Sequence, residues 1–276
     1  MKSPLKNSLI ALLASASIAT GARAQTVSTE AKDSISIVPQ AVASEPAREP
    51  APNAPITLDA SIRFTDKYTP GRGYVLSDEP SVQPYLMLNV PVPKIGGTFS
   101  VGYAGSISVG KQDYQEHDRL MSYARDIAIT RWGTLTGTVG HMTFTDNTMP
   151  GETRFSELQA QLKLQHALNP TVFFAHDYGA GNGQYIEGSL TRTMEFPIGE
   201  ISFPFDASMA VLYNNHYVIP GKGFAGMRLG ANVPLLSKDG ITIAADFKYF
   251  QTWQPERFKS NGSAGITLST SGPVLR

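Results

Sequence analysis

Residues 56–269 consist of about a dozen short segments in which apolar residues alternate with small or polar ones, joined by connections of alternating length. Because successive side chains of a strand point to opposite faces, each segment has one apolar and one polar face. A helix would instead group its apolar residues at spacings of three and four. The pattern predicts an all-β fold, a closed, up-and-down antiparallel barrel of about twelve strands that spans an outer membrane.

Four segments show the alternation most clearly, and they are residues 56–65, 205–213, 225–233 and 241–250. On the third segment, the apolar face is predicted to carry Ala225, Met227, Leu229, Ala231 and Val233. Eight further strands are predicted near residues 82–92, 97–106, 123–131, 134–145, 154–165, 171–178, 183–194 and 261–269. The segment 154–165 could also support part of a helix, because Leu and Gln are good helix formers. The segment 171–178 is apolar on both faces, so its orientation stays open.

The connections between the predicted strands fall into two classes that alternate along the chain. The short ones, which contain residues typical of turns, are 91–97, 131–133, 167–170, 197–202 and 236–240. The long ones are 66–81, 107–122, 146–153, 214–223 and 251–260, with a shorter connection at 179–183. Outer-membrane barrels have short periplasmic turns and long outer loops. An even number of strands therefore places both ends of the barrel, and the mature N-terminus, on the periplasmic side.

The first 55 residues are not expected to belong to the barrel. A positively charged start, a short apolar core and the sequence Ala22-Arg23-Ala24 predict a cleaved signal peptide at residues 1–24. Residues 25–55 are rich in Pro, Ala, Ser and Glu, and hold too little apolar surface to offset the entropy of ordering. We expect a disordered or extended periplasmic segment there, either a tether or a plain leader, and the barrel at residues 56–276.

The composition limits the partners and the chemistry of the mature chain. Removal of the signal peptide leaves 20 basic against 23 acidic residues, which gives no reason to expect nucleic acid as a partner. The chain has no cysteine, so disulfides, thiolate chemistry and a lipid anchor at an N-terminal cysteine are excluded. Charged residues make up 17% of the chain, below the roughly 25% of soluble domains. This low share fits a lipid-facing surface, although it also fits a secreted β-sandwich.

Aromatic residues gather near the ends of the predicted strands. We expect them to form girdles at the two membrane interfaces, where amphipathic rings lie at headgroup depth. The ordinary enrichment of aromatic residues in strands is the alternative. The residues are Tyr68, Tyr85, Tyr103, Trp132, Tyr178, Tyr185, Tyr213, Tyr217, Tyr249, Phe250 and Trp253.

Charged residues of both signs are predicted to line the lumen, on the polar faces of the strands. They are Asp59, Arg63, Asp126, Glu157, Lys163, Glu187, Asp206, Arg228, Asp246 and Lys248. Two interpretations stay open. The charges line a narrow water-filled passage and set its ion selectivity, or they pair across the lumen and fill it. A twelve-strand barrel is wider than the filled eight-strand kind and much narrower than the large porins.

Catalytic and metal sites find little support in the sequence. A membrane phospholipase of the barrel type carries a His-x-Ser-Asn-Gly element, whereas Ser260-Asn261-Gly262 has Phe258 in the histidine position. No histidine pair or carboxylate cluster has the spacing of metal ligands. The glycine-rich residues 179–183 lack the Lys-Ser/Thr of a phosphate-binding loop. We therefore predict that the chain is not an enzyme and has no cofactor and no metal.

Two stretches of the chain carry short motifs. The first is Phe64-Thr65-Asp66-Lys67-Tyr68, followed by Gly71-Arg72-Gly73 and by Asp78-Glu79-Pro80-Ser81-Val82-Gln83-Pro84. The second is Asn169-Pro170-Thr171-Val172-Phe173-Phe174-Ala175-His176-Asp177-Tyr178, followed by Gly183-Gln184-Tyr185-Ile186-Glu187-Gly188-Ser189-Leu190. In these motifs the chain resembles small proteobacterial outer-membrane porins with barrels of about twelve strands. The resemblance implies a channel-like protein and carries over no catalytic or binding residue.

The chain departs from this family at its last residues. Such proteins usually end on an aromatic residue that the barrel-assembly machinery recognises, whereas this chain ends Gly272-Pro273-Val274-Leu275-Arg276. Either a short tail follows the last strand or assembly uses an internal signal.

The favoured function is a channel in the bacterial outer membrane that passes small polar solutes or ions by diffusion. Its expected partners are outer-membrane lipid, the barrel-assembly machinery and the solutes, and its oligomeric state stays open. A structural or surface-contact barrel is the first alternative. An outer-membrane hydrolase that acts on lipid is the second.

Overall fold

The computed structural model describes residues 54–68, 77–110, 115–146, 153–179, 182–198, 201–217 and 221–275. The predicted signal peptide at 1–24 lies outside these residues. So does the predicted periplasmic segment at 25–55, apart from its last two residues.

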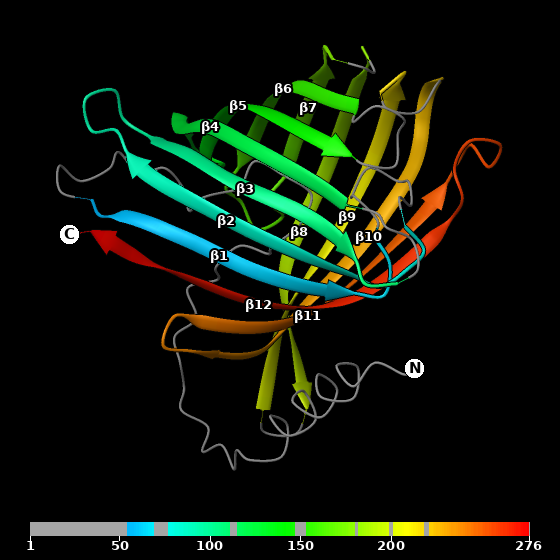
Figure 1. The fold of residues 1–276 in the computed structure, drawn as a ribbon. Coiled ribbons are helices and arrows are strands. Elements are labelled where there is room, and N and C mark those ends of the chain that lie inside the picture. Colours follow the sequence, from blue (N-terminus) through cyan, green and yellow to red (C-terminus); the bar gives the residue numbers. More distant parts are fainter. Residues whose placement is uncertain are drawn as a thin grey trace. The chain divides into compact units, whose positions relative to one another are not determined.

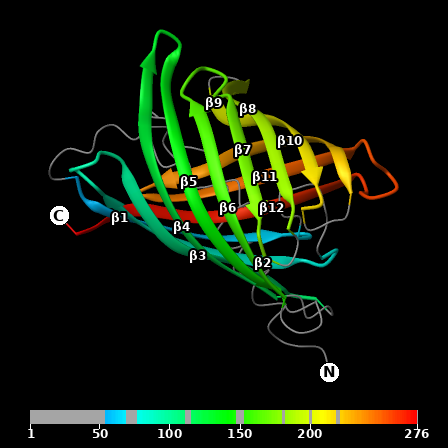
Figure 2. The same cartoon turned by 90° about the horizontal axis from the view of Figure 1, so that it is seen from above.

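Twelve antiparallel strands in the described residues form a closed barrel (Figures 1 and 2). Each strand pairs with the strands before and after it in sequence, and β1 pairs with β12 to close the ring. The strands are β1 (Ile56–Thr65), β2 (Ser81–Pro91), β3 (Thr98–Ser108), β4 (Gln115–Thr130), β5 (Gly133–Asp146), β6 (Thr153–Leu164), β7 (Thr171–Asp177), β8 (Gln184–Ile198), β9 (Ile201–Asn215), β10 (Lys222–Lys238), β11 (Ile241–Thr252) and β12 (Asn261–Leu275). The predicted fold is confirmed, and every predicted strand is present, although β12 continues past its predicted limit at residue 269.

The barrel wall carries apolar side chains outside and polar side chains inside. On β1, Ile62 and Phe64 are 43% and 38% exposed, whereas Arg63 between them is 1% exposed. On β6, Leu158 is exposed and its neighbour Glu157 is fully buried. A closed ring also leaves no unpaired strand edge in hydrocarbon. The wall is therefore that of a transmembrane barrel, and the register predicted for both strands is confirmed.

The described residues contain no helix that is long and apolar enough to cross a bilayer.

The long loop predicted at residues 107–122 is wrong in its second half. β4 begins at Gln115 and pairs with β3 from that residue onward. Glu116 and Asp118 are buried inside the barrel, whereas His117 between them is exposed. Polar residues occupy both faces of this part of the strand, so the apolar alternation that marks the other strands is missing here.

A bulge in β10 overturns one predicted orientation. The pairing of β10 with β9 skips Ala225, which lies between Phe224 and Gly226. Ala225 is therefore buried inside the barrel, whereas the alternation placed it on the lipid side. A Cβ atom on Gly226 would lie 2.1 Å from the backbone oxygen of Gln251, so the close approach requires glycine. Beyond the bulge the predicted orientation is confirmed, and Leu229 is exposed.

The lipid-facing surface is hollowed where β5 to β9 lie side by side. A groove of about 550 Å³ with an almost entirely apolar lining crosses these strands. Gly188 of β8 lies in this groove, and a Cβ atom there would meet nothing within 4 Å. The larger apolar side chains that line it include Leu135, Leu162, Val172, Leu190, Met209 and Val211.

Candidate functional site in the barrel lumen

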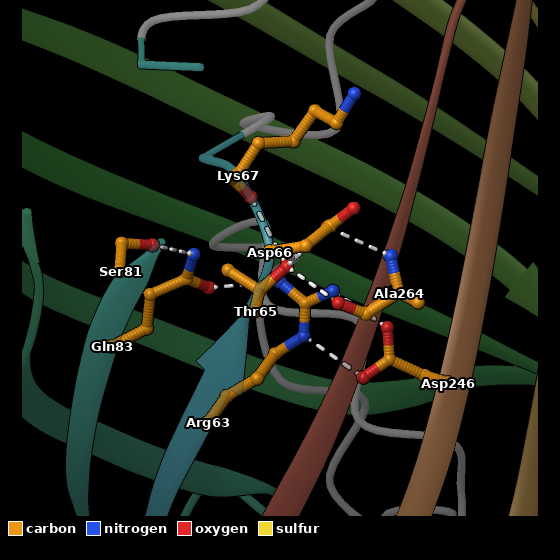
Figure 3. A network of polar contacts seen from close by, with 8 residues as sticks. All are labelled: Arg63, Thr65, Asp66, Lys67, Ser81, Gln83, Asp246 and Ala264. Atoms are coloured by element: carbon orange, nitrogen blue, oxygen red, sulfur yellow. Dashed lines mark hydrogen bonds and ion pairs between the residues drawn. The ribbon is translucent and has the colours of Figure 1, made fainter. Parts of the chain in front are cut away.

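A buried ion pair joins β1 to β11 inside the barrel (Figure 3). Arg63 donates from Nε to Oδ1 of Asp246 at 2.8 Å and from Nη2 to Oδ2 at 2.6 Å. The strand between them, β12, contributes Gly265, where a Cβ atom would lie only 2.9 Å from Arg63 Nε. Arg63 also donates from Nη1 to Gln83 Oε1 on β2 at 3.1 Å. The guanidinium group of Arg63 is therefore hydrogen-bonded to residues on both sides of β1. A bidentate, charge-assisted pair such as Arg63–Asp246 is strong.

A second ion pair repeats this geometry on the next strands. Arg228 of β10 donates from Nη2 to Glu187 Oε1 of β8 at 2.6 Å, over the intervening β9. Tyr185 donates its hydroxyl to the other oxygen of Glu187 at 2.6 Å. Leu212, the inward residue of β9 directly opposite Glu187, is fully buried. Both pairs thus connect strands that share no backbone hydrogen bonds.

Lys248 lies among the charges of these two pairs. It is on β11, two residues from Asp246, and directly opposite Gly230 of β10. The charges of both ion pairs act on it electrostatically. Its Nζ atom is buried and has no hydrogen-bond partner among the described residues. We refer to these five residues as the charge belt: Arg63, Glu187, Arg228, Asp246 and Lys248.

Three of the other predicted lumen residues are carboxylates that bond to neighbouring strands nearer the short-turn end. The bonds are Asn89 Nδ2 to Asp59 Oδ2 at 2.7 Å, Thr136 Oγ1 to Asp126 Oδ1 at 2.8 Å and Thr193 Oγ1 to Asp206 Oδ1 at 2.7 Å. Like Lys163, these three carboxylates are half-buried. Five of the ten predicted residues therefore come together in the charge belt, and the others lie elsewhere on the lumen wall.

Tyrosines from two loops enter the lumen at its loop end. Tyr68, which follows β1, donates its hydroxyl to Glu116 Oε1 of β4 at 2.7 Å. Tyr217, which follows β9, donates its hydroxyl to Glu157 of β6, the last of the ten predicted lumen residues. All four side chains are buried. The side chains of Tyr68 and Tyr217 thus extend into the lumen and bond to carboxylates three strands away in the ring.

This placement corrects the predicted aromatic girdles. Tyr68, Tyr185, Tyr217 and Phe250 are buried inside the barrel and do not face lipid. Tyr185, Tyr217 and Phe250 belong to one apolar cluster with Phe258, which comes from the loop between β11 and β12. Of the predicted girdle residues, Trp132, Tyr178 and Trp253 are exposed near strand ends, as a girdle requires.

The interior is therefore filled toward the loop end and more open toward the turn end. Gln83, Glu157 and Asp177, all near the loop end of their strands, are fully buried. Asp59 and Asp206, nearer the turn end, are half-buried. A polar solute that entered from the turn end would meet half-exposed polar groups first and the charge belt next.

Several of the buried polar groups that shape this lumen are not among the ten predicted residues. Glu116 and Asp118 fall within the predicted loop at residues 107–122, although the alternation of residues 123–131, extended backward, places both inside. Asp177, the last residue of β7, is also buried. No sequence signal distinguishes Tyr217, which enters the lumen, from a loop tyrosine that faces water.

Ser260 of the Ser-Asn-Gly sequence and the loop residue His216 have separate hydrogen-bond partners. Ser260 Oγ accepts a hydrogen bond from the backbone nitrogen of Thr252 at 3.2 Å. His216 Nδ1 lies 3.1 Å from Asn215 Oδ1 of the neighbouring residue. In the part of the chain that the structure describes, no three His, Cys, Asp or Glu side chains are grouped as metal ligands.

Comparisons with known proteins find similarity among solved structures alone. No protein family matches the sequence, and no curated protein does. Among solved structures, the chain is similar to CdiB from Acinetobacter baumannii, at 10% sequence identity and a TM-score of 0.43. The match covers 79% of this chain and 60% of that chain, so this chain spans less than two thirds of the neighbour's length.

Proposed function

We propose that this chain is an outer-membrane channel for small polar solutes or ions, with its selective constriction at the charge belt. The observation that carries the proposal is the polar interior, which runs from half-exposed Asp206 at the turn end to buried Arg63 near the loop end. A constriction lined by both signs of charge filters ions by size and by field.

The location and orientation belong to the same proposal. An outward apolar wall closed into a ring needs hydrocarbon around it, and bacterial outer membranes house such barrels. Ile56 and Leu275 pair with each other, so the two ends of the barrel lie on the same rim as the short turns. That rim is periplasmic in outer-membrane barrels, so our proposal includes a periplasmic mature N-terminus.

A closed structural barrel is the second candidate, and two observations favour it. The Arg63–Asp246 pair is buried, and Tyr68 and Tyr217 fill part of the lumen and bond to buried carboxylates. In that case the loops would make the surface contacts, and the charge belt would only stabilise the barrel wall. Catalysis is not part of either proposal.

Recordings from planar bilayers distinguish the two candidates. The purified full chain should give discrete current steps in potassium chloride. Asp206→Asn, which removes a half-buried lumen charge, should shift the reversal potential in a salt gradient toward anion preference. Asp239→Asn is the matched control, because Asp239 lies in the turn between β10 and β11. If no steps occur at any salt concentration, the structural barrel stands and the channel is rejected.

A further inference from the structure

Two positively charged groups of the charge belt have donors without partners. Lys248 Nζ is buried and donates to no described residue, and the same is true of Arg228 Nη1. A buried donor left without an acceptor is costly, and more so when it is charged. The folded barrel would therefore gain from an acceptor at this place.

The carboxylates of the charge belt are already engaged elsewhere. Asp246 uses both oxygens to accept from Arg63. Glu187 accepts from Arg228 with one oxygen and from Tyr185 with the other. Three cations thus face two carboxylates, which leaves one positive charge of the belt unmatched.

A hydroxyl group lies on the same patch of the wall. Ser208 of β9 is directly opposite Gly230, and Gly230 is directly opposite Lys248. A Cβ atom on Gly230 would lie 2.5 Å from Ser208 Oγ, so this hydroxyl extends over the glycine, between β9 and Lys248. The patch therefore combines an ammonium group, a guanidinium nitrogen and a hydroxyl, all hydrogen-bond donors.

We propose that Lys248, Arg228 and Ser208 form a binding site for one small anion inside the lumen. The anion is a chloride ion or the carboxylate or phosphate group of a solute, because each supplies a negative charge and acceptor atoms. It would reach the site from the turn end, where the lumen is more open. The site needs only the folded barrel, so it does not depend on whether the barrel conducts.

Chloride NMR line width measures this binding directly. The folded full chain in detergent micelles should broaden the chloride signal in dilute sodium chloride. Added acetate or phosphate should reverse the broadening, and which of the two does so identifies the oxyanion that the site prefers. Absence of broadening with the wild-type chain would overturn the proposal.

Variants of Lys248 locate the site. Lys248→Gln should abolish the broadening, and Lys248→Arg should retain it. Lys238→Gln is the matched control, because Lys238 is exposed at the turn end of the same hairpin. Lys248→Met, whose apolar side chain tolerates burial, replaces the glutamine variant if that fails to fold. Broadening that persists without the lysine would contradict the site.

The two measurements, bilayer current and chloride line width, separate this proposal from the channel. Current steps without chloride broadening would overturn the anion site and leave the channel intact. Broadening in a barrel that never conducts would establish the anion site and reject the channel.

Discussion

Arg63 and Asp246 lie on strands separated by a third, and they bond over Gly265 through two hydrogen bonds of 2.8 and 2.6 Å. The pair joins β1 to β11 independently of the backbone pairing through β12. Because both side chains are buried, each depends on the other for its counter-charge.

Asp246→Leu should destabilise the folded barrel by about 3–5 kcal/mol, because Arg63 would stay buried without its counter-charge. The double variant Arg63→Met, Asp246→Leu should lie much closer to the wild type, because neither member of the pair is then left buried without the other. Urea unfolding in lipid vesicles measures the free energy. Equal destabilisation in the single and double variants would contradict the account of the pair.

Gly265→Ala should destabilise the barrel by about 1–3 kcal/mol, because the added methyl group would force Arg63 away from Asp246. The matched control is Gly188→Ala on the lipid-facing wall, where a Cβ atom meets nothing within 4 Å. The same unfolding assay applies. An equal loss of unfolding free energy at both glycines would mean that Arg63 does not need the space that Gly265 leaves.

Leu229→Arg should cost about 2–4 kcal/mol if the residue lies near the bilayer midplane, because the charge would face hydrocarbon. Asn232→Arg is the lumen-facing comparison on the same strand, and its cross-strand neighbours are Asp206 and Asp246. It should fold with a much smaller loss. Folding yield in vesicles, followed by the heat-dependent gel shift, measures both. If both arginine variants fold equally well, the assignment of lipid-facing and lumen-facing residues on β10 is wrong.

Tyr217→Phe should raise the open-channel current, because the loop after β9 loses its hydroxyl bond to Glu157. The free energy of unfolding should fall by about 1–3 kcal/mol from the lost bond to a buried carboxylate. Tyr249→Phe is the control, because that hydroxyl bonds to Gln251 on the same strand at an exposed place. Unchanged current in both variants would mean that Tyr217 does not restrict the mouth.

The strands were predictable because apolar and polar alternation is a local property of the sequence. The lipid outside the barrel demands it on every strand, so even β6, with its helix-forming Leu and Gln, takes the predicted form. Ala225 was misplaced because a bulge inserts one residue and reverses the order of faces. Nothing in the apolar pattern itself marks a bulge.

The contacts of the lumen were not predictable, because they depend on which strands meet across the barrel. Arg63 and Asp246 are 183 positions apart in the chain. The alternation predicts that both side chains face the lumen. That they pair with each other depends on the closure of β1 against β12, which no local pattern reveals. The composition of a loop predicts an interfacial position for Tyr217, and it does not reveal that this side chain enters the lumen.

The seven residues of β7 are few for a wall strand, next to 12 in β6 and 15 in β8. At a rise of about 3.4 Å per residue and a tilt of about 40°, β7 reaches only about 18 Å along the membrane normal, less than the roughly 25 Å apolar band of such barrels. We expect lipid tails beside this strand to shorten or to bend toward the apolar groove. The bilayer around the barrel should therefore be thinnest beside β7.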